Sequence, residues 1–470
     1  HDDKSWYPTG RDVSATSQIM LHATAAITYQ IFAGNSSLYD FTILFPAVIG
    51  SLTVVVIFAL VRLFAGTTAG LIASLLFAVS LPIIIRGSIG WFKSEPLGIF
   101  YGLLGLYLFL SAIKSENKKI AVLKIIFGGI VMAFGMASWG GNQFFIIPIG
   151  LFILALPFIR KDHKFLLWSI PLFVGVFLLT CASFERPGLT FVIGMGGVSL
   201  ILPTIFLVIC IFIQKISSDK NKTRNGLILL LLIIIIGCSL FVLQSEFAPG
   251  DVPNFRYLNA INPLFVDIDP LTDSVSEHAS KTIEISYLFH SVLMIFAGLG
   301  IWILLSKKIS QTFVTNDMKV FVLIFGMTGV FLSSSFIRLE IFASISLIIF
   351  SSIALSILTK NIFKIQFSGI KNYLFKISYV VIILFLFTTP LFIPENVNWI
   401  DAIDFPPSIF NGASSNPPTN DWLDTLEWIK LNTPENAVIA SWWDYGYWIQ
   451  TMAERTTFID NSTLIDSRIK

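Results

Sequence analysis

The sequence predicts a polytopic α-helical membrane protein whose last part is the start of a soluble domain of mixed α/β structure. The 470 residues are 55% hydrophobic, with a mean hydropathy of +0.79. Charged residues make up 13% of the chain, about half the share that is usual in soluble proteins. Apolar runs of about 20 residues, the length that crosses a bilayer, recur between residues 39 and 395. Residues 396–470 are polar.

Residues 1–38 are expected to form an external loop with an amphipathic helix on the membrane surface. Their apolar stretch, 12–33, contains Gln18, His22 and Thr28 and is therefore polar for a span. An amphipathic helix can lie in the interface with its apolar side in the lipid.

Residues 39–395 are expected to form a transmembrane domain of about 12 spans. Short loops join several of the apolar runs, and this requires antiparallel neighbours. The expected spans are 39–64, 66–85, 96–113, 119–138, 142–159, 163–182, 189–214, 225–243, 286–306, 318–335, 338–358 and 372–393.

Lys and Arg are distributed unevenly among the loops between these spans. They gather in alternate loops, around 114–124, 160–164, 215–224 and 360–376. By the positive-inside rule these loops face the cytoplasm. The outer side then holds the loops near 86–96 and 244–285, together with both terminal parts of the chain.

Residues 396–470 are expected to be the start of an external, soluble C-terminal domain. A polar cap ahead of an apolar face formed by Leu426 and Ile429 predicts a helix. Residues 437–440 form a short apolar run that predicts a buried strand. The sequence stops at Lys470 within this domain, so we expect the domain to be truncated.

The strand leads directly into an unusually aromatic motif, SWWDYGYW at Ser441–Trp448. Soluble surfaces seldom expose so much aromatic area unless something binds there. Asp444 can accept a hydrogen bond from a hydroxyl, and the indoles of Trp442 and Trp443 offer flat walls and donors. The motif therefore predicts a pocket for a small hydroxylated group. The alternative is an aromatic belt at the membrane–water interface.

Three charged residues on the outer side stand out. Glu277, in the loop 244–285, could ligate a divalent cation or bind an amide, or it could be a solvated loop acid. Glu95 precedes a span, where an acid also favours the helix dipole. Arg338 lies between two spans, where a charge is unfavourable unless it has a function. Arg338 could bind a phosphate group, or it could instead pair with Glu340.

Together the motifs identify a resemblance to a known family. WWDYG is complete at Trp442–Gly446, SVSE at Ser274–Glu277, and Lys4–Arg11 reads KSWYPTGR. In the order KSWYPTGR, SVSE and WWDYG along the whole chain, these motifs resemble the catalytic subunit of oligosaccharyltransferase, of the archaeal and eukaryotic type. That enzyme moves a lipid-linked glycan onto Asn in Asn-x-Ser/Thr. The resemblance implies a fold of the GT-C glycosyltransferase type, and metal-dependent transfer with inversion at the sugar.

The resemblance also implies roles for the residues that bind the two substrates. Trp442, Trp443 and Asp444 would hold the acceptor hydroxyl, with Tyr445 as a further substrate-binding residue. Arg338 would contact the lipid-linked phosphate. The implied partners are a lipid-linked oligosaccharide, an acceptor polypeptide and membrane lipid. Whether accessory subunits bind is left open by the resemblance. The active site would face the extracytoplasmic side.

Glu277 and Glu95 would be the catalytic residues and the ligands of a Mg²⁺ or Mn²⁺ ion. Lys93 stands where the family has another acid, and a charged Lys cannot ligate a metal. Either the site uses fewer ligands, or Lys93 contacts the phosphates as a substrate-binding residue, or the local match is shifted. A further acidic motif would precede His1 and a further acceptor motif would follow Lys470, so we expect a fragment.

Other functions are less consistent with the sequence. A different membrane glycosyltransferase that uses a polyprenyl-phosphate sugar would share the spans but would not need a hydroxyl pocket. A transporter would carry charges within its spans. A net charge of +2 gives no reason to expect nucleic-acid binding. The chain also carries acceptor tripeptides of its own at Asn35, Asn221 and Asn461. We expect Asn221, on the inner side, to stay unmodified, whereas the other two could be modified.

Overall fold

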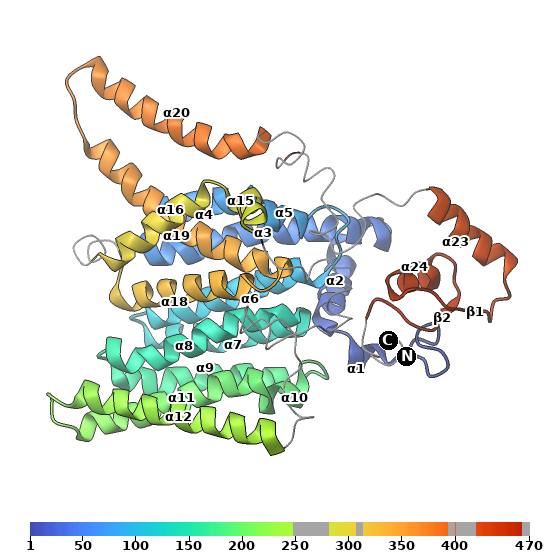
Figure 1. Ribbon diagram of the computed structural model, residues 1–470, viewed down its shortest axis with the longest axis horizontal. Coiled ribbons are helices and arrows are strands. Elements are labelled where there is room, and N and C mark those ends of the chain that lie inside the picture. The colour runs from blue at the N-terminus through green and yellow to red at the C-terminus, as the bar shows by residue number, and fades with distance from the viewer. Residues whose placement is uncertain (248–281, 307–313, 393–399, 401–419, 463–470) are drawn as a thin grey trace.

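The protein is a bundle of long helices with a small C-terminal unit at one end (Figure 1). The computed structural model describes residues 1–247, 282–306, 314–392, 400 and 420–462. Within them, nine helices are long and apolar enough to cross a membrane. These are α3 (Leu38–Ala65), α6 (Ser94–Ile113), α7 (Lys118–Ser138), η1 (Gly140–Asn142) with α8 (Gln143–Ile159), α9 (His163–Ala182), α11 (Met195–Ile216), α18 (Asn316–Ser333), η4 (Ile337–Leu339) with α19 (Glu340–Lys364), and α20 (Ile370–Phe392).

Three of the expected spans are interrupted. The span expected over 66–85 is α4 (Thr67–Ala78) followed by α5 (Leu81–Ile85), with a proline in the first turn of α5. The stretch expected over 189–214 divides into α10 (Gly188–Ile193) and α11 at an extended Gly194. The stretch expected over 286–306 is α15 (Ile283–His290) and α16 (Leu293–Leu305), bent by 85°.

Two further segments complete the helical part. A long apolar helix, α12 (Lys222–Phe247), packs against α11. The N-terminal stretch forms α1 (Val13–Thr16) and α2 (Ile19–Phe32). At 14 residues, α2 is shorter than the ~20 residues that a span needs. Its Leu21 and Ala25 are buried against α3 and α6, so one face of α2 is fixed to the bundle.

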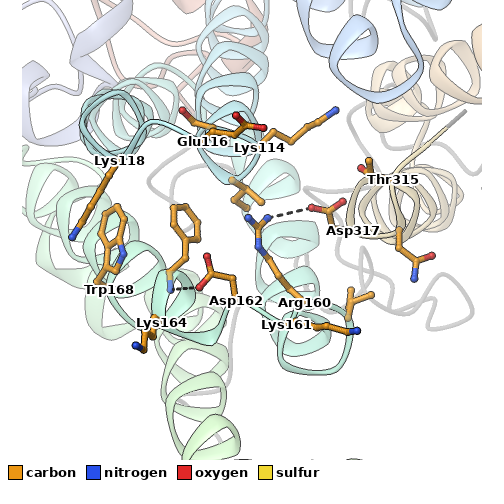
Figure 2. A pocket seen from close by; sticks show the side chains of 15 residues that line it. Lys114, Glu116, Lys118, Arg160, Lys161, Asp162, Lys164, Trp168, Thr315 and Asp317 are labelled. Carbon is orange, nitrogen blue, oxygen red and sulfur yellow. Dashed lines mark hydrogen bonds and ion pairs between the residues drawn. The ribbon is translucent and has the colours of Figure 1, made fainter.

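The loops rich in Lys and Arg lie at the end of the bundle opposite the C-terminal unit (Figure 1). Between the α6–α7 loop, the α8–α9 loop and the start of α18 lies a hollow of about 730 Å³, whose lining includes Lys114, Lys118 and Lys164 (Figure 2). Arg160 and Asp317 form an ion pair across it, at 3.3 Å. The hollow therefore marks the basic end of the molecule.

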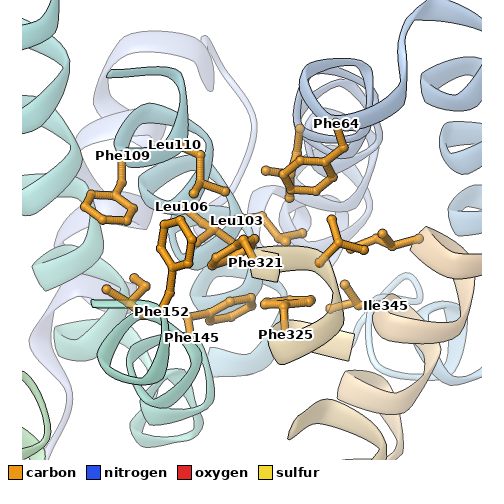
Figure 3. Close-up of a cluster of buried hydrophobic side chains, with 14 of the residues drawn as sticks. Phe64, Leu103, Leu106, Phe109, Leu110, Phe145, Phe152, Phe321, Phe325 and Ile345 are labelled. Atoms are coloured by element: carbon orange, nitrogen blue, oxygen red, sulfur yellow. The ribbon is translucent and has the colours of Figure 1, made fainter. Parts of the chain in front are cut away.

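The core of the bundle is rich in phenylalanine (Figure 3). Rings from different helices meet edge to face, as with Phe152 and Phe321, whose centroids lie 5.2 Å apart. Small residues bring the helices close together: a Cβ on Gly105 of α6 would lie 3.0 Å from the backbone nitrogen of Met132 in α7. Such close packing is the main source of helix association in a membrane.

The C-terminal unit combines helices with a small parallel sheet. It contains α23 (Asn420–Asn432), β1 (Val438–Ile439), η5 (Trp443–Tyr445), α24 (Gly446–Thr451) and β2 (Thr456–Thr457). The two strands are parallel, with Val438 opposite Thr456. Leu426, Ile449 and Ala453 form its core. This is the mixed α/β structure that the sequence predicts.

The N-terminal segment packs against this C-terminal unit. The backbone N–H of Tyr7 donates to the carbonyl of Thr457 (3.1 Å), and that of Thr457 donates to the carbonyl of Lys4 (2.9 Å). Asp2 and Arg11 bridge to each other, which closes the segment into a loop. The two terminal parts therefore meet at the same end of the bundle as the loop 86–93.

Candidate active site

The first half of the candidate site is a buried ion pair between Glu95 and Arg338. Glu95 lies in the first turn of α6 and is 3% exposed, and its Oε1 accepts a hydrogen bond from Arg338 Nη2 at 3.2 Å. Arg338 is presented by the short turn η4, between α18 and α19. A buried carboxylate needs such a partner, because an uncompensated charge in the interior is strongly destabilising.

The loop before α6 adds two more cations to this pair. At Gly90 the backbone turns with a φ of +84°, and the Gly90 N–H donates to the carbonyl of Ile43 (2.9 Å), which holds the loop on α3. The guanidinium of Arg86 and the ammonium of Lys93 both lie over the indole ring of Trp91, at 5.8 Å and 4.3 Å from its centroid.

The positive charges of Arg338, Lys93 and Arg86 all act on Glu95. Guanidinium and ammonium groups that gather in this way can bind an anionic group such as a phosphate.

A second buried pair lies beside the first. His290 Nε2 is hydrogen-bonded to Glu340 Oε1, and both side chains are buried. His290 ends α15 at the sharp bend, and Glu340 begins α19. The sequence offered Glu340 as an alternative partner of Arg338, but the structure pairs Arg338 with Glu95 and Glu340 with His290. Arg86, Arg338 and Glu340 line a small cavity between the two pairs.

The second half of the candidate site is the WWDYG turn. β1 ends at Ile439, and the chain then turns through η5, so that Trp442 is 51% exposed whereas Trp443 is buried. The two rings lie 6.1 Å apart. Within the described residues, the indole N–H of Trp443 has no hydrogen-bond partner. A buried donor without a partner is uncommon in a folded protein and is a candidate for binding a ligand.

Asp444 connects the two halves. Burial raises the pKa of the Asp444 carboxyl above its usual value, while the charge of Lys93 and a hydrogen bond from the Trp442 side chain act in the opposite direction. Lys93 thus acts on both Asp444 and Glu95. The aromatic turn and the Glu95–Arg338 pair are therefore both within the electrostatic range of one lysine.

Tyr445, the fourth residue of the motif, packs within the C-terminal unit. Its ring packs on Trp422 with a centroid distance of 4.4 Å and on Trp448 at 6.1 Å, within the core of the C-terminal unit. The role of Tyr445 in substrate binding stays a prediction, and these contacts give its ring a packing role as well. The aromatic residues of the motif therefore contribute both to the predicted pocket and to the core of the C-terminal unit.

The described residues provide only part of a metal site. Glu277 and the rest of SVSE lie outside them, so the structure does not place this carboxylate. Among the described residues, the buried Glu95 Oε2 has no hydrogen-bond partner, and it could take one metal bond. In the part of the chain that the structure describes, no three His, Cys, Asp or Glu side chains gather around a common point. The described residues thus supply one candidate ligand and do not by themselves fit a divalent ion.

Sequence reasoning missed three residues that position the aromatic turn: Arg11, Asp460 and Asn461. Arg11 Nη1 donates to the Tyr447 hydroxyl at 2.8 Å and lies 3.6 Å from Asp460 Oδ2. No local pattern could have linked Arg11 with residues so far away in the chain. Asn461 was noted only as part of an acceptor tripeptide.

Comparison with known proteins identifies the family. Residues 1–393 match the family model described as oligosaccharyl transferase STT3, N-terminal. The chain belongs to this family. It is 26% identical to the glycosyltransferase subunit STT3 of Dictyostelium discoideum and 24% identical to STT3B of Arabidopsis thaliana, along its whole length in both cases. It spans about two thirds of the length of these relatives, 66% and 67%.

The fold is that of the archaeal oligosaccharyltransferase AglB from Archaeoglobus fulgidus. The two structures superpose with a TM-score of 0.73 at 18% identity, over 98% of this chain and 58% of AglB. AglB has been solved with an inhibitory peptide and a dolichol-phosphate, with a tethered acceptor peptide containing an NVT sequon, and with Zn and sulfate. The apolar helices and the family together make this chain an integral membrane protein.

Proposed function

We propose that this protein transfers an oligosaccharide from a polyprenyl or dolichyl phosphate or diphosphate carrier to the Asn of Asn-x-Ser/Thr in proteins. The observation that carries the proposal is the buried indole N–H of Trp443, which has no hydrogen-bond partner among the described residues and lies next to Asp444 in the WWDYG turn. The charge of Lys93 acts on Asp444 and on Glu95, the partner of Arg338, so a site for a hydroxylated acceptor would adjoin a cationic site for a phosphate. Membership of the STT3 family supports the same reaction.

The acceptor site would bind the hydroxyl of the Ser or Thr. Ionised Asp444 can accept a hydrogen bond from that hydroxyl, and the indole N–H of Trp443 can donate one to the hydroxyl oxygen. Exposed Trp442 would form a wall against the peptide. A hydroxyl fixed two residues after the Asn would orient the Asn amide toward the donor, and such positioning is a major part of catalysis.

The donor site would bind the phosphate of the lipid carrier. Arg338 can donate to phosphate oxygens, with Lys93 and Arg86 adding positive charge nearby. As the bond from the sugar's anomeric carbon to the phosphate oxygen breaks, negative charge grows on the phosphate. Cations already in place stabilise that charge as it develops.

The acceptor amide must become a nucleophile. Its nitrogen lone pair is conjugated with the carbonyl, and carboxylates that accept hydrogen bonds from both N–H groups can reduce that conjugation. We assign this role to Glu277 together with Glu95. The nitrogen attacks the anomeric carbon from the face opposite the phosphate while the bond from that carbon to the phosphate oxygen breaks, so the sugar configuration inverts. One amide proton passes to the Glu95 carboxylate that accepts its hydrogen bond.

A Mg²⁺ or Mn²⁺ ion held by Glu95 and Glu277 would supply further positive charge to the leaving phosphate. The free oxygen of Glu95 and the relative that was solved with Zn and sulfate support such a site. The orientation of the basic loops supports a site on the extracytoplasmic side. These loops lie at the end of the bundle away from the C-terminal unit, which contains the WWDYG turn (Figure 1).

The test is a transfer assay on membranes that contain the whole protein. A labelled Asn-Ala-Thr peptide and native lipid extract are incubated with and without EDTA, and an Asn-Ala-Ala peptide is the matched control. Glycopeptide from the Thr peptide alone, lost with EDTA and restored by Mg²⁺ or Mn²⁺, is the expected result. Sugar transfer to another acceptor with none to the peptide would instead indicate a different lipid-linked glycosyltransferase.

A further inference from the structure

We infer that Asn461, although part of an acceptor tripeptide, is not a glycosylation site but a positioning residue that holds the acceptor pocket. The inference rests on the proposed function, because the residue it positions is Asp444. Asp460 and Arg11 keep Asn461 in place.

Both ends of the Asn461 amide are bonded to the backbone of the aromatic turn. Nδ2 donates to the carbonyl of Asp444 at 2.8 Å, and Oδ1 accepts from the N–H of Tyr447 at 3.2 Å. The Tyr447 N–H lies in the first turn of α24, where helix N–H groups lack partners within the helix. One side chain thus links the backbone at Asp444 to the first turn of α24, directly after the turn that presents Trp443 and Asp444.

The same contacts make Asn461 a poor acceptor. Glycosylation requires Nδ2 to approach a sugar carbon with its lone pair free, whereas here Nδ2 donates to Asp444 and lies against the motif. The chain is also packed closely at this point. A Cβ on Gly446 would lie 2.5 Å from the Cα of Asp460 and 2.5 Å from the carbonyl oxygen of Ile459. The glycine of WWDYG is therefore the residue that lets this segment approach.

Asp460 and Arg11 fix the segment from the other side. Asp460 is fully buried, and its Oδ1 accepts hydrogen bonds from the backbone N–H and the hydroxyl of Ser462. The Arg11 guanidinium lies 3.6 Å from Asp460 Oδ2 and donates to the Tyr447 hydroxyl at 2.8 Å. Arg11 also donates to Thr16 and Ser17. A continuous set of polar contacts thus links the N-terminal segment to the pocket.

The test compares two variants that both abolish the tripeptide signal. Asn461→Asp places a carboxylate oxygen against the Asp444 carbonyl and removes the donor. Thr463→Ala removes the signal and leaves the amide intact. We expect Asn461→Asp to raise the KM for the acceptor peptide about tenfold, the effect of losing one or two buried hydrogen bonds. The kcat and the KM for the lipid donor should stay near wild type, and Thr463→Ala should behave like wild type.

Two results would overturn the inference: a glycan on Asn461 in the wild-type protein, or a loss in Thr463→Ala equal to that in Asn461→Asp. Unchanged donor kinetics show that Asn461→Asp is folded. If that variant is inactive, hydrogen exchange of the wild-type protein tests the contact between Asn461 and the Tyr447 N–H. Slow exchange of this N–H is the expected result, and fast exchange contradicts the contact. Glycan occupancy and hydrogen exchange are measured without the transfer assay, so both still test the role of Asn461 if the protein proves not to transfer a glycan.

Discussion

Glu95 and Arg338 are far apart in the sequence, and each had an acceptable explanation of its own there. Glu95 could have been a helix N-terminal acid, and Arg338 could have paired with the nearby Glu340. The structure pairs them with each other and gives Glu340 to His290. The sequence could single out charges near the membrane, because such charges are unfavourable without a role. It could not choose between partners, because that choice depends on how the helices pack.

Substitutions at this ion pair should affect the stability of the protein and its transfer activity separately. Arg338→Gln leaves Glu95 buried without its partner and should lower the free energy of unfolding by about 2 kcal/mol, less than for a fully buried pair because Arg338 is partly exposed. Glycan transfer should be lost. Thermal unfolding in detergent measures the first effect.

The double variant Arg338→Gln/Glu95→Gln is the matched control. It removes both charges, so stability should return toward wild type while transfer stays absent. A double variant that regains transfer would show that the pair is structural only.

Asp444 predicts a pH dependence of acceptor binding. Burial raises its pKa above the ordinary value of 3.8, and only the ionised form can accept the hydroxyl proton in a hydrogen bond. The KM for the peptide should therefore rise on acidification, beginning at a higher pH than for an exposed Asp. The raised pKa also means that Asp444 favours the folded state less as pH rises through this window. Peptide kinetics from pH 4 to pH 7 measure the effect, and Asp444→Asn should have a high KM without this dependence.

At the scale of elements, apolar runs located the helices well but missed how some of them bend. A proline inside the expected span 66–85 marks the start of α5 and could have signalled that break. The 85° bend between α15 and α16 has no such sign, since neither Pro nor Gly lies between His290 and Leu293. There, Ser291 adopts a φ of +42° beside the buried His290–Glu340 pair. Tertiary contacts, not local sequence, accompany that bend.

The close approach at Gly446 gives a prediction for the C-terminal unit. Gly446→Ala would force its Cβ against the backbone of Ile459 and Asp460, and overpacking of this kind destabilises by about 1–3 kcal/mol. Gly175→Ala in α9 is the control, because nothing lies within 4 Å of that position. Limited proteolysis should cut the C-terminal unit faster in Gly446→Ala alone. Equal protection of both variants would refute the close packing.

At the scale of the molecule, the N-terminal segment and the C-terminal unit form one end together. Arg11 and Tyr447 are 436 residues apart in the chain, yet their side chains are hydrogen-bonded. The sequence placed both terminal parts on the outer side from the bias of Lys and Arg, which is a property of whole loops. It could not predict that they touch, because no pattern within either part refers to the other.

This arrangement predicts which end is reached from outside the cell. Asn432→Cys lies at the C-terminal unit and Glu116→Cys at the basic end. Both variants are made in a chain whose three native cysteines, Cys181, Cys210 and Cys238, are replaced by Ser. A membrane-impermeant maleimide should label Asn432→Cys in intact cells and Glu116→Cys only after permeabilisation. The reverse pattern would contradict the proposed orientation.

In the proposed reaction, the WWDYG turn selects a hydroxylated acceptor for a glycan whose carrier phosphate is bound at Arg338. The most direct measurement is the ratio of transfer to Asn-Ala-Thr over Asn-Ala-Ala peptides, in wild type and in Trp443→Phe, which keeps an aromatic ring but removes the indole N–H. We predict a large ratio in wild type and a fall of about tenfold in Trp443→Phe, as expected for one buried hydrogen bond. Equal transfer to both peptides by the wild-type protein would contradict the account.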